Sequence, residues 1–221
     1  MATNLDQQIT TPTQPNLGAP QSWYDERFFA QSFGGLNVYF NKLTAIFSAL
    51  FGRRGGKWLN MPYGSFQDST DQTAANTTTA YAITFDTIDF SNGVTLSNSS
   101  RLNVSQDGVY NIQFSIQLEN STNDTQDVDI WFRKNGTDIA KSNSIFGLPS
   151  RKSSGDPSHS VASLNYFISL LANDYVQIMW RTSNIGVTIQ AYAAGTSPTR
   201  PTTPSAIVTL SFVSNLSTET A

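Results

Sequence analysis

The stretch SRLNVSQDGVYNIQFSIQL, residues 100–118, carries the clearest structural pattern in the chain. From Val109 onward its residues alternate between two faces, and this period of two is typical of a β-strand with one buried and one solvated face. The buried face would carry Tyr110, Ile112, Phe114, Ile116 and Leu118, and the solvated face Val109, Asn111, Gln113, Ser115 and Gln117. Asp107-Gly108, just before the alternation, has the composition of a turn. Segments on both sides alternate in the same way, so we predict a central strand of one large β-domain.

The composition argues against several classes of protein. Charged residues make up 13% of the 221 residues and the net charge is −3, so the surface has no strong electrostatic attraction for nucleic acid or an acidic membrane. The chain has no cysteine, which excludes disulfides, thiolate zinc sites and cysteine nucleophiles. The first residues lack the basic start and apolar core of a signal peptide, and no stretch approaches the roughly 20 apolar residues of a membrane-spanning helix. We expect no nucleic-acid partner and no membrane insertion.

Residues 1–22 are predicted to form an extended arm. Pro12, Pro15 and Pro20 restrict the backbone, and the segment has too few apolar residues for a core of its own. Such an arm would become ordered by lying along a partner. The alternative is a tail with no role.

Residues 23–51 are predicted to be helical and unusually apolar. Ser22 would cap a helix that begins at Trp23, and Gly34-Gly35 would interrupt it. The run that follows places large apolar residues at alternating spacings of four and three, the heptad pattern of a coiled-coil seam. The seam residues are Leu36, Phe40, Leu43, Phe47 and Leu50. Such a helix needs a cover, and three are open: copies of itself around a symmetry axis, another protein, or its own β-domain.

The segment GRRGGKW, residues 52–58, is predicted to join the helix to the rest of the chain. Gly52 would end the helix, the following glycines would form a hinge, and the cations would favour the C-terminal end of the helix dipole. We therefore treat residues 23–61 as an apolar helical anchor with its hinge, and residues 62–221 as a β-domain.

From residue 62 onward the pattern is all β, with short alternating segments separated by turns. Asn135-Gly136 is the strongest hairpin signal, and Ser144–Ser160 and Gly195–Pro204 are predicted to be surface loops. The predicted strands are Tyr63–Gln67, Thr79–Phe85, Gly93–Leu96, Ser100–Val104, Gly108–Leu118, Gln126–Lys134, Thr137–Ser142, Val161–Leu170, Tyr175–Arg181, Val187–Ala194 and Ser205–Ser214. Many short strands with such loops predict a sandwich of two sheets.

Several of these segments, taken in order, resemble the C1q and tumour necrosis factor-like jelly rolls. DGVYNIQFSIQL, residues 107–118, looks like the strand that carries the family's Gly-Val-Tyr signature. DVDIWFRKNGTDIA, residues 127–140, resembles the next hairpin, and SLNYFISLLANDYVQIMW, residues 163–180, resembles the paired strands around an Asn-Asp turn. AIVTLSFVSNL, residues 206–216, would be the C-terminal central strand. The resemblance covers about residues 62–216 and implies a jelly-roll fold.

This family assembles as compact trimers, with aromatic and aliphatic side chains of one sheet packed near the threefold axis. The resemblance therefore implies a homotrimer, in which the seam residues of three helices would also meet at the axis. The candidates for the core of the β-domain or for the trimer axis are Tyr110, Tyr166, Tyr192 and Phe212.

A second resemblance concerns residues 54–70, RGGKWLNMPYGSFQDST, and residues 77–94, TTTAYAITFDTIDFSNGV. Both are similar to structural proteins of cyanophage-type and related marine bacteriophage particles. The resemblance implies a virion protein that is assembled in the host cytoplasm, with residues 1–61 docked on a capsid or tail protein. It leaves open whether the protein belongs to the head or to the tail.

Nothing in the sequence forms a convincing catalytic or metal site. His159, the single histidine, has Asp156 three residues before it, but no nucleophile-elbow motif accompanies them. Carboxylates could pair as in glycosidases, although turn caps and solvated loops explain them better. These carboxylates are Asp86, Asp89, Asp124, Asp127 and Asp129. Calcium at Asn123, Asp124 and Asp127 would lack EF-hand spacing. We expect no enzyme, no metal and no cofactor.

The expected function is therefore structural. The chain would be a non-enzymatic virion protein, the trimeric knob of a fibre or appendage, with residues 144–160 and 195–204 as contact surfaces for a host glycan or receptor. A capsid decoration (cement) protein that stabilises the phage head is the close alternative. A soluble carbohydrate-binding module with a dispensable N-terminus is the second alternative.

Overall fold

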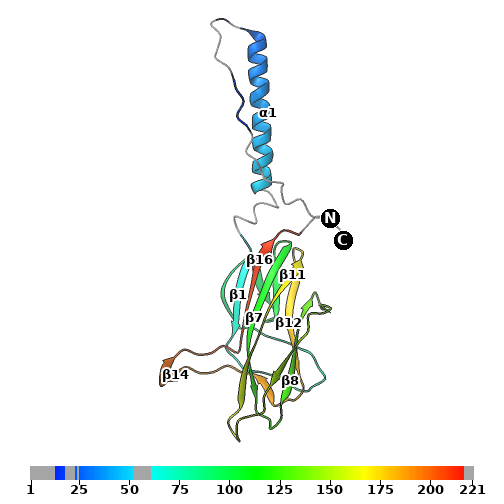
Figure 1. Ribbon diagram of the computed structural model, residues 1–221, viewed down its shortest axis with the longest axis vertical. Helices are drawn as coiled ribbons and strands as arrows, with labels where there is room; N and C mark the ends of the chain where they lie inside the picture. Colours follow the sequence, from blue (N-terminus) through cyan, green and yellow to red (C-terminus); the bar gives the residue numbers. More distant parts are fainter. Residues whose placement is uncertain (1–12, 18–22, 24, 52–60, 217–221) are drawn as a thin grey trace. The chain divides into compact units, whose positions relative to one another are not determined.

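The computed structural model of the chain describes residues 13–17, 23, 25–51 and 61–216 (Figure 1). The chain divides into two compact units, residues 1–60 and 61–221. The first unit contains the helix α1, and the second contains the strands β1 to β16. No helix among the described residues combines the length and the hydrophobicity needed to cross a membrane.

In the first unit, the helix α1 spans Glu26–Phe51. Asp25 caps it, because its carboxylate oxygen Oδ1 accepts the backbone N–H of Arg27 at 2.9 Å. A side-chain oxygen in this position satisfies an N–H group that the first turn of a helix leaves unpaired. The predicted start at Trp23 is therefore wrong, and the predicted cap, Ser22, lies outside the described residues.

The predicted break at Gly34-Gly35 is also wrong, because α1 continues through both glycines. A glycine in a helix interior costs about 1 kcal/mol relative to alanine, and the helix formers on both sides outweigh that cost. A methyl group at Gly35 would lie 3.7 Å from Cβ of Pro15, so residues 13–17 of the arm approach the helix at this position.

In the second unit, the strands of residues 61–216 form two antiparallel seven-stranded sheets and a small hairpin. The first sheet has the order β4 (Thr87–Asn92), β1 (Tyr63–Asp68), β16 (Ala206–Ser214), β7 (Gly108–Asn120) and β11 (Ser158–Leu170), with β13 (Val187–Ile189) beside β7 and β2 (Gln72–Thr73) beside β13. The second has the order β5 (Val94–Ser97), β6 (Arg101–Val104), β12 (Tyr175–Thr182), β8 (Gln126–Lys134) and β10 (Ser144–Leu148), with β3 (Tyr81–Ala82) beside β12 and β9 (Thr137–Asp138) beside β8. The hairpin of β14 (Gly195–Thr196) and β15 (Thr199–Arg200) extends away from both sheets (Figure 1). The predicted all-β architecture with an N-terminal helix is confirmed.

β7 is the central strand that the alternation predicts. Along one edge its whole length pairs with β11, from Gly108 opposite Leu170 to Asn120 opposite Ser158. Along the other edge it pairs with β16 and, near its end, with β13. The predicted faces are confirmed, because the side chains at positions 110, 112, 114, 116 and 118 are at most 4% exposed, while those between them are partly or largely exposed.

The two sheets pack face to face through aromatic rings that both contribute. Phe114 on β7 meets Phe132 on β8 edge to face, with ring centroids 6.0 Å apart. Phe132 also stacks on Tyr166 of β11, with centroids 4.9 Å apart. Such aromatic pairs contribute about 0.5–1.5 kcal/mol beyond their burial. These rings join the inner faces of the sheets into one core.

Several strands differ from the predicted ones. β2, β4 and β10 have no predicted counterpart. β4 is an edge strand whose residues are almost all exposed, so it shows no alternation. β10 and the start of β11 lie in the predicted loop Ser144–Ser160, and β14 and β15 lie in Gly195–Pro204. The strands before and after Asn173-Asp174 do not pair with each other, because β11 pairs with β7 and β12 pairs with β8. This turn crosses between the sheets, which the local sequence does not reveal.

The hairpin at Asn135-Gly136 is confirmed. It joins β8 to β9, with Lys134 opposite Thr137. The backbone angle φ is 48° at Asn135 and 84° at Gly136. Positive φ at both central residues is what a type I′ turn requires, and asparagine and glycine tolerate it best.

The burial pattern of β7 predicts a large difference between two identical truncations. Ile112→Ala should lower the free energy of unfolding by about 2–5 kcal/mol, because it leaves a cavity in a packed core. Ile145→Ala on β10 is the matched control, since Ile145 is 67% exposed and its truncation should change stability by no more than about 0.5 kcal/mol. Chemical denaturation measures both values. A similar loss in the two variants would mean that the assignment of faces is wrong.

Candidate interaction surfaces

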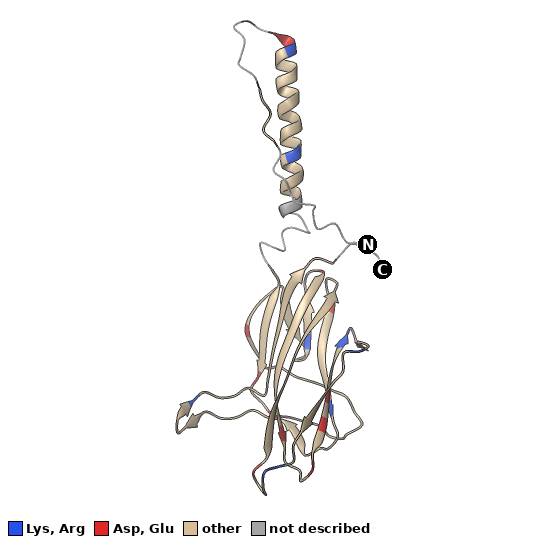
Figure 2. Ribbon diagram, viewed as in Figure 1, with Lys and Arg blue, Asp and Glu red and all other residues tan. Residues whose placement is uncertain are grey.

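The predicted seam of α1 is largely exposed in the single chain. Phe40 and Phe47 are 57% and 51% exposed, and Leu36 and Leu43 are partly buried. Leu50 lies in α1, but its side chain is outside the described part of the chain. The charged residues of α1 are Glu26, Arg27 and Lys42 (Figure 2). This helix therefore exposes large apolar side chains and carries few charges.

The seam is longer than predicted, because the helix does not break at its glycines. The spacing of four and three continues from Leu36 back to Phe33 and Phe29. Phe33 is 67% exposed, and its ring stacks on that of Phe29 with centroids 6.4 Å apart. Phenylalanine occupies one heptad position and leucine the other over most of the seam. The full seam is Phe29, Phe33, Leu36, Phe40, Leu43, Phe47 and Leu50.

A second surface lies on the outward side of β7 and its two neighbours, and we call it the uncharged face. None of the side chains that define it carries a charge, and Figure 2 shows how sparse charge is along these strands. They are Val109, Asn111, Gln113, Ser115 and Gln117 on β7, Val161, Ser163, Asn165, Phe167 and Ser169 on β11, and Ile207, Thr209, Ser211 and Val213 on β16. Phe167 is 58% exposed and Val161 52%. Surfaces that stay in water usually intersperse charges of both signs.

Asn111, on the central strand of the uncharged face, carries an unusual atom. Its side-chain oxygen Oδ1 is buried and finds no hydrogen-bond partner among the described residues. Its neighbours across the strands are Phe167 on β11 and Ser211 on β16. A buried acceptor without a partner costs about 1–3 kcal/mol, so such atoms are rare in folded proteins.

The four aromatic candidates lie in three different environments. Tyr110 and Phe212 point into the core, at 0% and 6% exposure, with their rings edge to face and 5.7 Å apart. Burial, together with the charge of Asp107, raises the pKa of Tyr110 well above its usual range. Tyr166 is partly buried on Phe132. These three side chains therefore belong to the inside of the sandwich, and only Tyr192 lies at a polar surface.

Tyr192 lies in a polar cluster that sequence reasoning did not predict. Its hydroxyl donates to Oε2 of Glu119 at 2.9 Å and also lies 2.9 Å from Nδ1 of His159. Burial and the neighbouring Glu119 raise the pKa of Tyr192 well above its usual range, so the hydroxyl stays protonated. His159 therefore meets a tyrosine and a glutamate, whereas Asp156 pairs with Lys152 at 3.6 Å. The Ser-His-Asp arrangement considered from the sequence is not formed.

Three of the five carboxylates considered for catalysis, Asp86, Asp89 and Asp129, have structural partners. Asp86 accepts hydrogen bonds from Ser69 and Thr87, which outweigh the effect of burial and lower its pKa. Asp89 accepts from Ser65 at 3.0 Å and from Gln67 at 2.7 Å, and so ties β4 to β1. Within the described ranges, no three or more His, Cys, Asp or Glu side chains are grouped to hold a metal ion.

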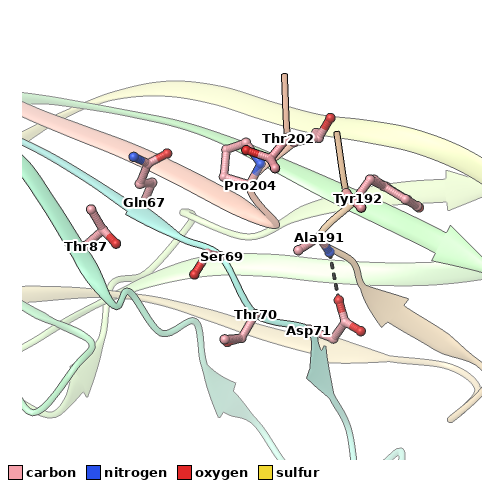
Figure 3. Close-up of a pocket in the computed structure, with 11 residues that line it drawn as sticks. Gln67, Ser69, Thr70, Asp71, Thr87, Ala191, Tyr192, Thr202 and Pro204 are labelled. Carbon is pink, nitrogen blue, oxygen red and sulfur yellow. Dashed lines mark hydrogen bonds between the residues drawn. The ribbon is translucent and has the colours of Figure 1, made fainter. Parts of the chain in front are cut away.

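Two of the cavities formed by the described residues of the β-domain bear on function. One of about 540 Å³ lies where the end of β1 faces residues 191–204 (Figure 3). Asp71 accepts the backbone N–H of Ala191 at 2.9 Å there, and the ring of Tyr192 turns away from the other lining side chains. This cavity offers polar groups without an aromatic wall. The other, of about 350 Å³, lies beside Trp131 on the outward side of the second sheet.

Comparison with known proteins does not assign the chain to a family. No model of a known protein family matches it, and no curated protein gives a significant match.

Proposed function

We propose that the protein is a non-enzymatic structural protein that assembles as a homotrimer, with the α1 seam and the uncharged face as its contact surfaces. The observation that carries the proposal is the seam, in which Phe33, Phe40 and Phe47 are each more than half exposed in the single chain. Burying each such ring is worth roughly 1.5–3 kcal/mol. Association with further copies of the helix supplies that burial, because a seam of this spacing packs side by side with its own copies.

The uncharged face suits contact with copies of itself. Near a symmetry axis a side chain meets its own copies, so a charge there would be repelled. Asparagine and glutamine amides and serine and threonine hydroxyls both donate and accept hydrogen bonds, so they can pair with identical groups. In such an interface Phe167 and Val161, which are 58% and 52% exposed in the single chain, supply apolar area.

The strand order supports a jelly-roll fold. The strands β1, β6, β7, β8, β10, β11, β12 and β16 can be numbered one to eight along the chain. The first sheet then reads 1-8-3-6 and the second 2-7-4-5. Two Greek keys wrapped into a sandwich produce this order. It agrees with the resemblance of residues 62–216 to the C1q and tumour necrosis factor-like domains. These domains assemble as trimers, and the proposed number of three copies comes from that resemblance.

The proposed location is a bacteriophage particle, and it rests on the resemblance of residues 54–70 and 77–94 to virion proteins. Residues 1–61 dock on a capsid or tail protein, and the β-domain is the knob of a fibre or appendage presented to the host surface. A capsid decoration protein with the same trimer is the close alternative. A soluble carbohydrate-binding module is the second, and the cavity beside Trp131 is the observation that favours it.

A single thiol placed on the seam tests the helical contact. The chain has no cysteine, so Phe40→Cys and Ala45→Cys each carry one thiol. Phe40 lies on the seam, and Ala45 lies on the far side of the helix. Mild oxidation should link Phe40→Cys chains in covalent pairs on a denaturing gel and leave Ala45→Cys chains mostly unlinked. Equal cross-linking of the two variants would remove the seam as a contact surface.

A charge placed on the uncharged face tests the second contact. Phe167→Asp should weaken self-association at least about tenfold, because the carboxylate would be buried near its own copies. Ile145→Asp is the matched control, since Ile145 is 67% exposed on the other sheet and its change should leave association unaltered. Sedimentation equilibrium measures both. Association that survives Phe167→Asp unchanged would contradict the assignment of this face.

Gold-labelled antibodies against residues 61–221 test the particle-bound role. Applied to intact phage particles that encode the chain, they should bind the particle. Label near the tail identifies a fibre or appendage, and label over the whole head identifies a decoration protein. Particles that carry no label, with the chain trimeric in solution, would refute the virion role and favour the soluble module.

A further inference from the structure

The cavity beside Trp131 brings together residues that are distant in the sequence. It has a volume of about 350 Å³, at the lower end of the roughly 300–1,000 Å³ typical of small-molecule sites. Its walls come from β8, β9, β12 and the connection between β9 and β10. The lining side chains are Asp129, Trp131, Asp138, Ile139, Lys141, Asn143 and Arg181.

Trp131 gives the cavity an aromatic wall. Its indole N–H donates to Oδ1 of Asp138 at 2.8 Å, which fixes the orientation of the ring. Met179, which is 2% exposed, lies opposite it on β12, and Ile139 lines the cavity nearby. A fixed indole ring flanked by aliphatic side chains suits a ligand that is apolar on one side and polar on the other.

Two ion pairs border this wall. Asp138 pairs with Arg133 at 2.6 Å, and this hydrogen bond lowers the pKa of Asp138, so its carboxylate is an acceptor at neutral pH. Asp129 accepts from Arg181 at 2.9 Å and from Asn143 at 2.9 Å. Donors and acceptors are thus held in fixed positions around the cavity, the arrangement that recognises hydroxyl groups.

Lys141 adds a positive charge that no partner cancels. The two carboxylates are matched by Arg133 and Arg181, whereas no ion pair joins Lys141 to another described residue. Its φ of 64° lies in the left-handed region, where residues other than glycine, asparagine and aspartate are strained. The ammonium attracts one carboxylate, while the aspartates of the wall disfavour a multiply charged phosphate.

We propose that this cavity binds a carbohydrate that bears one carboxylate, that is, an acidic sugar. The C–H face of the sugar ring packs on Trp131, its hydroxyls meet Asp138 and Arg181, and its carboxylate pairs with Lys141. All of these groups come from one chain, so the site is complete without the trimer and goes beyond the proposed structural role. Failure of assembly and failure of sugar binding are therefore separate results.

The test compares matched methyl glycosides on the full chain, glucuronide with glucoside and galacturonide with galactoside. The members of each pair differ in a carboxylate against a hydroxymethyl group. Ligand-detected NMR titrations give the dissociation constants. At least one acidic glycoside should bind about five- to tenfold more tightly than its neutral partner. Equal binding within both pairs, or no saturable binding of any glycoside, would overturn the proposal.

Three variants locate the site. Trp131→Ala should weaken binding of every glycoside at least about tenfold. Lys141→Ala should abolish the preference for the acidic glycoside and leave the neutral one unchanged, and because Lys141 is exposed the fold should survive. Lys152→Ala is the matched control, a 59% exposed lysine outside the cavity, and should alter neither. Thermal unfolding checks that each variant is folded. A preference for the acidic glycoside that persists in Lys141→Ala would overturn the assignment.

Discussion

The alternation of side chains along β7 is the constraint on which the β-domain depends. β7 is hydrogen-bonded along both edges, so its side chains can leave the sheet only inward or outward. The inward set, from Tyr110 to Leu118, builds the core against β8 and β12. The outward set defines the uncharged face together with β11 and β16. A shift of register by one residue would exchange the two sets, so one pattern specifies both the fold and the proposed contact surface.

The proposed assembly follows from what each unit leaves uncovered in the single chain. α1 exposes phenylalanine along its seam, and the β-domain exposes an uncharged face that includes Phe167 and Val161. The burial of apolar area drives association. The amides and hydroxyls of the uncharged face can hydrogen-bond to their own copies, as a symmetric interface requires. The cavity beside Trp131 lies on the second sheet and differs in character, because it carries charges: two aspartates paired with arginines, and Lys141. The proposed contact between copies and the proposed ligand binding thus involve different sheets of one domain.

Local patterns were enough to predict β7, the hairpin at Asn135-Gly136 and the apolar character of α1, because each depends on residues near in sequence. The break at Gly34-Gly35 was wrongly predicted, since glycine propensity is a small energy that a long helix overrides. Period alone could not tell whether Tyr110 and Phe212 face the core or a partner, because that depends on which sheet covers them. The Trp131 cavity was not predicted, because it depends on strand pairing rather than on local sequence. Pairing of β8 with β12 and with β9 brings Arg181 and Asp138 to the cavity.

The most direct test of self-association is the solution mass of the complete chain and of residues 61–221, measured by size exclusion with light scattering. The complete chain should have three times its mass of 24.2 kDa. The β-domain alone should also be trimeric if the uncharged face is a contact surface in its own right, and it has its own core with which to fold. A complete chain that is monomeric at micromolar concentration would contradict the account, because the seam and the uncharged face would then both remain in water.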